Sequence, residues 1–236
     1  MNILISGADR GLGLGLTKKM LKRGYTVFAG QYLSEWNELV LLKQAFPDTL
    51  HIISLDVSND ENVKAASLQV EKITDELDVL IGNAAIIGWL EDRSADLTDT
   101  EMMAEVYNVN TIGNVRLFEN FLPLLQKGCE KKICFVSSEA GSINDCQRTN
   151  FFWYGMTKSA LNYYAKVMFN RYRSDDFKFR LYHPGWIQSY MRGPIDEAAD
   201  LTPDEAAGFA MDYFFDQIVD EDQLVLYGYD GKILNF

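Results

Sequence analysis

Short apolar runs alternate with segments of helical period along almost the whole chain, and no other sequence feature constrains the fold as strongly. The apolar runs predict buried strands at residues 3–5, 25–29, 51–55, 79–81, 132–136, 179–182 and 224–227. The segments between them predict helices at residues 11–22, 34–46, 59–76, 101–126 and 154–172. Strands that alternate with helices of this length form right-handed βαβ units. We therefore expect a mostly parallel sheet of about seven strands with helices on both faces.

Local signals and chain length favour one doubly wound domain. Ser34 and Asn59 precede their helices as expected N-caps, and Pro47 follows the second helix as a stop. No repeat, low-complexity tract or Pro/Gly/Ser-rich linker divides the 236 residues. Residues 1–236 are predicted to form a single three-layer α/β sandwich.

Charge and cysteine usage argue against several kinds of partner. A formal net charge of −12 repels both a phosphate backbone and an anionic membrane, so we expect neither nucleic acid nor membrane as a partner. Cys129, Cys134 and Cys146 form no CxxC pair, and the sequence has only two histidines, so no metal site is predicted. The N-terminus opens on a strand and not on a secretory signal, which predicts a cytoplasmic protein.

A glycine-rich turn follows the first predicted strand and opens the first helix. Residues 6–13 read Ser-Gly-Ala-Asp-Arg-Gly-Leu-Gly, a GxxxGxG spacing. Glycines permit the tight turn and a close backbone approach, and the free N–H groups of the helix start bind a pyrophosphate. The place of the turn in the first βαβ unit favours a Rossmann-type dinucleotide site over an ordinary glycine-rich turn. The expected cofactor contacts here are Gly7, Asp9, Arg10, Gly11, Leu12 and Gly13.

The sequence favours NADP(H) and leaves NAD(H) open. An acidic residue at the end of the second strand would bind a ribose 2′-hydroxyl, but Gln31 and Tyr32 stand there. Arg10 can face a 2′-phosphate, with a solvated turn arginine as the alternative. We expect Gln31 to contact the cofactor at this end.

Tyr154 and Lys158 stand four residues apart, on one face of a predicted helix. A phenol has a pKa near 10, and a nearby ammonium and a nicotinamide cation would bring it towards neutrality. Such a pair is common by chance, so its support comes from Ser138, which closes the fifth predicted strand. Ligands bind at the ends of parallel strands, so the three side chains are candidates for acid–base chemistry.

These segments, in this order, resemble the short-chain dehydrogenase/reductase family over essentially the whole chain. Residues 6–13 are similar to the family's TGxxxGxG turn, with Ser6 in place of Thr. Residues 82–85, Gly-Asn-Ala-Ala, resemble its NNAG motif with the first Asn and the last Gly replaced. Residues 109–113 match the segment that bears the family's catalytic Asn, and residues 183–189, His-Pro-Gly-Trp-Ile-Gln-Ser, resemble its PG motif.

The resemblance implies a role for each matching residue. The catalytic set would be Asn110, Ser138, Tyr154 and Lys158. Tyr154 would exchange a proton with a carbonyl oxygen to which Ser138 donates a hydrogen bond. Lys158 would hold the ribose hydroxyls and lower the phenol pKa, and Asn110 would anchor a water that relays protons. Further cofactor contacts would be Asp56, Val57, Asn83, Ala84, Tyr154, Lys158, Pro184, Gly185, Ile187 and Ser189.

Within the family, HPGWxxSxM at residues 183–191 and Tyr-Asp-Gly-Lys-Ile at 229–233 are similar to the C-factor and sniffer-like carbonyl-reductase branch. This branch implies an active-site rim at residues 142–153 and a substrate-rim segment near 189–203. The resulting hypothesis is an NAD(P)(H)-dependent oxidoreductase of a carbonyl or alcohol substrate. The alternative is a catalytically weak NAD(P)-sensing or signalling protein on the same fold. The family also implies a homodimer or homotetramer, built from the helix at 154–172 and the preceding long helix.

Overall fold

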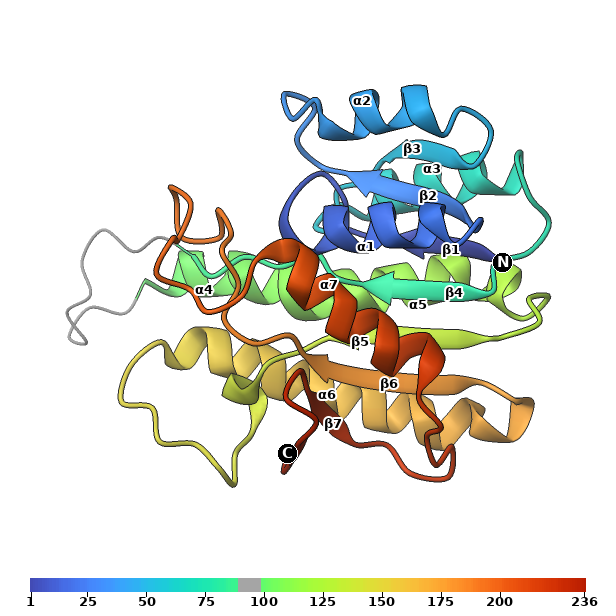
Figure 1. Cartoon of the computed structure of the whole chain (residues 1–236). Helices are drawn as coiled ribbons and strands as arrows, with labels where there is room; N and C mark the ends of the chain where they lie inside the picture. Colours follow the sequence, from blue (N-terminus) through green and yellow to red (C-terminus); the bar gives the residue numbers. More distant parts are fainter. Residues whose placement is uncertain (89–98) are drawn as a thin grey trace.

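The computed structural model describes residues 1–88 and 99–236, which form one mixed sheet between two layers of helices (Figure 1). The strand order is β3-β2-β1-β4-β5-β6-β7-β8, and each pair is parallel except β7 with β8. The strands are β1 (Asn2–Ile5), β2 (Thr26–Gln31), β3 (Leu50–Ser54), β4 (Val79–Gly82), β5 (Lys132–Val136), β6 (Lys178–His183), β7 (Leu226–Gly228) and β8 (Ile233–Leu234). The predicted doubly wound α/β fold is confirmed, with one short antiparallel strand more than expected.

Two hydrophobic cores hold the three layers together. On one face, α1 (Gly11–Lys22), α2 (Glu38–Ala45) and α7 (Pro203–Met211) cover the sheet, and on the other lie α3 (Asp60–Glu71), α4 (Thr100–Tyr107), α5 (Gly113–Leu125) and α6 (Phe152–Tyr172) (Figure 1). Successive strand residues point to opposite faces, so Ile3 and Ile5 of β1 enter one core and Leu4 the other. Burial on both faces explains why the strands read as continuous apolar runs.

The helix predicted at 101–126 is confirmed from Thr100 to Leu125, although its middle is not regular α-helix. A π-turn (Asn108–Ile112) separates α4 from α5 and carries Asn110. Ser34 is not an N-cap, because α2 begins only at Glu38, after Asn37. Asn59 is a true N-cap, whose side chain accepts a hydrogen bond from the N–H of Asn62.

The helix α7 had not been predicted, although its start carries a readable signal. The Thr202 hydroxyl accepts from the N–H of Glu205, the Glu205 carboxylate accepts from the N–H of Thr202, and Pro203 stands between them. This reciprocal capping box with a proline in the first turn is typical of a helix N-terminus. The helix packs against α1, beside the glycine turn.

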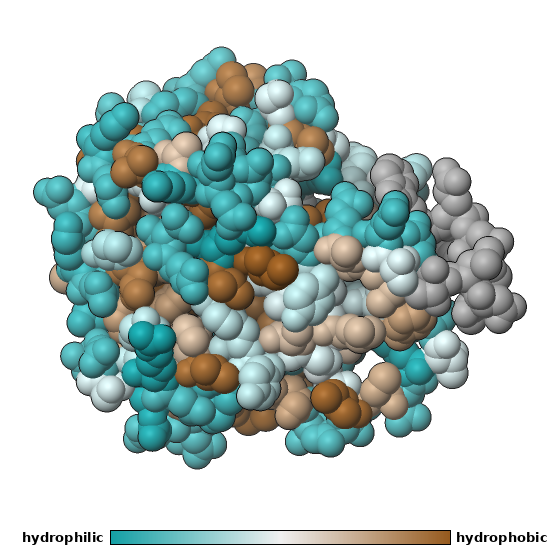
Figure 2. Space-filling model, turned by 180° about the vertical axis from the view of Figure 1, so that it is seen from behind, coloured by the Kyte–Doolittle hydropathy of each residue, from teal (hydrophilic) through white to brown (hydrophobic). Residues whose placement is uncertain are grey.

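The helical face seen in Figure 2 bears the surface on which a subunit contact was predicted. Apolar side chains stand there among polar ones, and a groove of about 450 Å³ opens between α4, the start of α5 and α6. Its lining residues are Tyr107, Thr111, Ile112, Val115, Ala160, Tyr163, Tyr164 and Val167. The homodimer or homotetramer stays a prediction. None of the helices within the described ranges is long and apolar enough to cross a membrane.

Candidate active site

The glycine turn lies at the carboxyl ends of β1 and β4, on the side of the sheet where the loops gather in Figure 1. Gly7 and Gly11 have φ angles of +62° and +54°, which side chains rarely adopt. A Cβ on Gly13 would lie 2.1 Å from the carbonyl oxygen of Gly7, so only glycine permits this turn. Asp9 and Leu12 are buried within it.

The start of α1 is free to bind an anion. Within the described part of the chain, Arg10 makes no side-chain capping bond at this helix start, and the first turn contains no acidic residue. Helix N–H groups without a partner attract a phosphate, so the turn fits the predicted pyrophosphate.

Asn83, the residue after β4, forms hydrogen bonds to this turn. Its Nδ2 donates to the carbonyl oxygens of Ser6 and Gly7 at 2.9 and 3.0 Å. The Ser6 hydroxyl in turn accepts from the N–H groups of Asn83 and Ala84, each at 3.0 Å. Because both amide hydrogens are used on the turn, the side chain of Asn83 acts by fixing the shape of the site.

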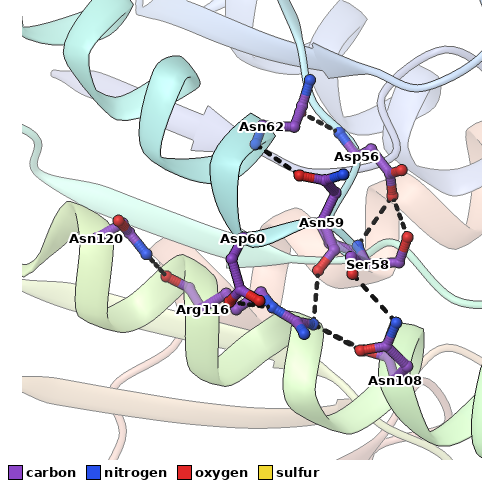
Figure 3. Close-up of polar contacts among 9 residues, drawn as sticks. Asp56, Ser58, Asn59, Asp60, Asn62, Asn108, Arg116 and Asn120 are labelled. Atoms are coloured by element: carbon purple, nitrogen blue, oxygen red, sulfur yellow. Dashed lines mark hydrogen bonds and ion pairs between the residues drawn. The ribbon is translucent and has the colours of Figure 1, made fainter.

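Asp56 and Val57, which were expected to contact the cofactor, lie in a polar network shown in Figure 3. The Asp56 carboxylate accepts from the N–H and hydroxyl of Ser58 at 2.9 and 2.6 Å. Arg116 of α5 donates to Asp60, to the carbonyl of Val57 and to the side chain of Asn108. The loop after β3 is thereby tied to the π-turn. Sequence reasoning missed Arg116, which nothing in a helical pattern singles out.

At the end of β2, Gln31 and Arg10 both contact the loop that leads to α2. The Gln31 amide donates to the carbonyls of Leu33 and Trp36 at 3.2 and 3.1 Å. The Arg10 guanidinium lies 5.2 Å from the ring centroid of Trp36, and this ring packs edge-on against Tyr190 at 4.8 Å. Arg10 is therefore held by cation–π contact and is not a freely solvated turn residue. Trp36 was not among the predicted residues.

Three of the four predicted catalytic residues meet where β5 ends against α6. Ser138 precedes a 3-10 turn (Glu139–Gly141), and its hydroxyl accepts from the N–H of Ala140 at 3.1 Å. Lys158 is 1 % exposed and donates to the carbonyl of Val136 at 2.9 Å. Its ammonium lies 5.6 Å from the ring centroid of Tyr154.

Asn110, the fourth residue, is fully buried next to this group. Its Oδ1 accepts from the N–H of Ile86 at 2.8 Å, and its Nδ2 donates to the carbonyl of Ile86 and to the hydroxyl of Thr157 at 2.8 and 3.1 Å. The side chain thus fastens the loop after β4 to the turn of α6 that precedes Lys158. The water relay expected of Asn110 stays a prediction.

In the protein by itself, burial has the largest effect on the pKa values of Tyr154 and Lys158. Burial raises the pKa of Tyr154 to about 12, and the Glu139 carboxylate acts in the same direction. The Ser138 hydroxyl and the guanidinium groups of Arg148 and Arg192 oppose this rise. Burial also lowers the pKa of Lys158 to about 8. The expectation that Lys158 and a nicotinamide cation lower the phenol pKa stays a prediction, because desolvation dominates in the protein by itself.

The segment after β6 completes the rim. Gly185 has a φ of +79°, and a Cβ there would lie 2.8 Å from the ring of Tyr229. Ile187 forms an isolated parallel bridge with Leu201, which fixes the base of the rim loop. A Cβ on Gly11 would have Ser189 as its nearest neighbour, at 3.9 Å. The rim therefore faces the glycine turn, and Pro184, Gly185, Ile187 and Ser189 lie on the predicted cofactor side.

Comparison with known proteins identifies the family. The family model described as short chain dehydrogenase matches residues 1–200. An uncharacterized oxidoreductase of Schizosaccharomyces pombe is 30% identical over 98% of this chain and 96% of its own length. The chain belongs to the short-chain dehydrogenase family and is an oxidoreductase of that family.

Solved structures agree with this assignment. The NADPH-bound carbonyl reductase from chicken fatty liver superposes with a TM-score of 0.87 at 29% identity, covering 100% of this chain and 98% of the other. The carbonyl reductase Sniffer of D. melanogaster superposes with a TM-score of 0.88 at 27% identity, covering 100% and 99%. Both similarities extend over the whole length and favour the carbonyl-reductase-like branch that the motifs had indicated.

Proposed function

We propose that this chain is an NADPH-dependent carbonyl reductase in which Tyr154 is the proton donor. The observation that carries the proposal is the meeting of Ser138, Tyr154 and Lys158 at the end of β5, on the same sheet edge as the anion-binding start of α1. The similarity to an NADPH-bound carbonyl reductase supports the cofactor and the substrate class.

In this proposal the bound cofactor supplies a hydride for the carbonyl carbon. The start of α1 binds the pyrophosphate, and Lys158 holds the ribose hydroxyls from its buried position. The Tyr154 Oη donates its proton to the substrate oxygen as negative charge develops on it. Ser138 donates a hydrogen bond to the same oxygen and stabilises that charge. The raised pKa of Tyr154 keeps the phenol protonated, as a reductase requires.

The proposal is tested by NADPH consumption with a panel of aldehydes and ketones, measured beside NADPH binding by calorimetry. Turnover of at least one carbonyl compound is expected. Tight NADPH binding without turnover of any would contradict the proposal. That outcome would favour the alternative, an NADP-sensing protein on the same fold.

Replacing Arg10 by Ala is expected to weaken NADPH binding by about 10- to 150-fold and to leave NADH binding unchanged. A charge-assisted hydrogen bond to the 2′-phosphate contributes about 1.5–3 kcal/mol, and NADH lacks that phosphate. The stack on Trp36 holds the guanidinium in place for this contact. Dissociation constants of both cofactors, measured by calorimetry, check the prediction.

Lys22→Ala removes one positive charge from the exposed far end of α1 and serves as the matched control. It is expected to affect neither cofactor. If Arg10→Ala weakens both cofactors equally, Arg10 binds the shared pyrophosphate and does not select NADPH.

A further inference from the structure

Glu139, the residue after Ser138, is the centre of a cluster that the proposed mechanism does not use. Its Oε2 accepts from the Ser138 hydroxyl at 2.5 Å and from the N–H of Ala140 at 2.7 Å. Its Oε1 accepts from the guanidinium of Arg148, which extends from the loop before α6. His183 Nδ1 lies 3.8 Å from Oε2. One carboxylate thus connects the end of β5, the loop before α6 and the end of β6.

The Ser138 hydroxyl has a single hydrogen, and in this structure Glu139 receives it. Burial favours the neutral acid, yet the hydrogen bond from Ser138 and the charges of His183 and Arg148 together hold the pKa of Glu139 below its usual range. Glu139 is therefore a carboxylate at neutral pH and can only accept. Ser138 must turn away from it before it can donate to a substrate oxygen.

The same carboxylate acts electrostatically on the phenol that would lose a proton in the reaction. The charged groups that act on Tyr154 are Glu139 on the 3-10 turn, Arg148 on the loop before α6 and Arg192 on the segment after β6. Lys158, on the same helix, lies 5.6 Å from the ring centroid. His183 faces Glu139, Arg148 and Asp230, and burial lowers its pKa. The Glu139 carboxylate raises the pKa of Tyr154, because a negative charge disfavours a second one nearby.

We propose that Glu139, clamped by Arg148, is a positioning residue that orients the Ser138 hydroxyl and keeps the proton on Tyr154. The inference rests on the proposed function, because keeping Tyr154 protonated has a role in the reaction only if Tyr154 is the proton donor. The phenol remains an acid to higher pH, and Ser138 is held close to the reacting oxygen until substrate displaces Glu139 as its acceptor.

The direct test does not need turnover. Tyrosine labelled with ¹³C at Cζ reports phenol ionisation by NMR, and the Tyr154 signal is identified by its loss in Tyr154→Phe. Glu139→Gln keeps the size of the side chain and removes its charge. The titration midpoint of Tyr154 is expected to move about one pH unit lower in this variant. It is expected to stay near the wild-type position in Glu139→Asp, which restores the charge.

Glu71→Gln, at the exposed end of α3, removes the same charge elsewhere and is the matched control. It should leave the Tyr154 signal unmoved. A midpoint that is the same in the wild type and in Glu139→Gln would overturn the inference, whether or not the protein reduces carbonyls.

The pH dependence of kcat/KM for carbonyl reduction gives a second readout. Reduction needs the protonated phenol, so activity falls as pH rises through its pKa. Glu139→Gln should shift this fall to lower pH by about the same one unit. If Glu139→Gln lowers kcat/KM by the same factor at every pH, the midpoint does not move. Glu139 would then have a structural role only, and the inference would be refuted. If the wild type has no turnover, the proposed function fails, and the NMR titration still decides the role of Glu139.

Discussion

Tyr154→Phe is expected to lower kcat for carbonyl reduction by about 10²–10⁴-fold, the usual contribution of a positioned general acid. The variant loses one oxygen and keeps the ring that lies 5.6 Å from the Lys158 ammonium. Packing at the start of α6 should therefore be preserved, and NADPH should bind with nearly unchanged affinity. Steady-state kinetics and calorimetry on the same preparation measure the two quantities.

A tyrosine on the same helix provides the control. Tyr163 is 74 % exposed, so Tyr163→Phe removes a hydroxyl without altering the site, and wild-type kinetics are expected. Wild-type turnover in Tyr154→Phe would remove Tyr154 from the mechanism. Loss of both turnover and cofactor binding would show that the phenol is needed to assemble the site.

Lys158→Met is expected to abolish turnover and to make the protein more stable. The ammonium is almost fully buried, and the carbonyl of Val136 is its one hydrogen-bond partner among the described residues. Burial lowers its pKa from 10.5 to about 8, which means that the fold disfavours the charged form. The variant removes the cost of burying this charge, but it also loses the hydrogen bond to Val136. The free energy of unfolding at pH 7 should therefore rise by about 1–2 kcal/mol. Urea unfolding measures it.

The sign of the pH dependence follows from the same shift. Below pH 8 both the folded and the unfolded wild type carry the charge, so the full cost of burying it is present. Between pH 8 and 10.5 the folded protein releases the proton before the unfolded chain does, and wild-type stability rises relative to the variant. The advantage of Lys158→Met should therefore shrink across this window. Lys166→Met, at an exposed position of α6, should change stability by less than about 0.5 kcal/mol. A variant less stable than the wild type at pH 7 would contradict the prediction.

The fold and the core of the site were predictable because their signals are local or periodic. The GxxxGxG turn requires glycines at fixed positions, and the alternation of apolar runs with helices determines a parallel sheet. Since strand ends share one edge, Ser138 could be placed near Tyr154 and Lys158 before their contacts were seen. The capping box of Thr202 and Glu205 was also local, so α7 could have been predicted.

The parts that were missed depend on contacts between distant segments. Arg116 reaches the loop after β3, and Trp36 lies between Arg10 and Tyr190. No local pattern shows which partner a charged or aromatic side chain will meet. The rise of the Tyr154 pKa in the protein by itself was missed for the same reason, because it comes from burial and from the neighbouring Glu139.

The π-turn between α4 and α5 makes the site sensitive to chain length. A π-turn contains one residue more than the α-helix it interrupts, and each residue of a helix turns it by about 100°. Deleting a single residue from this turn would give one regular α-helix from α4 to α5. The side chains of α4 would then point in new directions relative to those of α5. Asn110 would lose its hydrogen bonds to Ile86 and Thr157. A shortened chain could thus gain helical regularity while it lost the connection between β4 and α6.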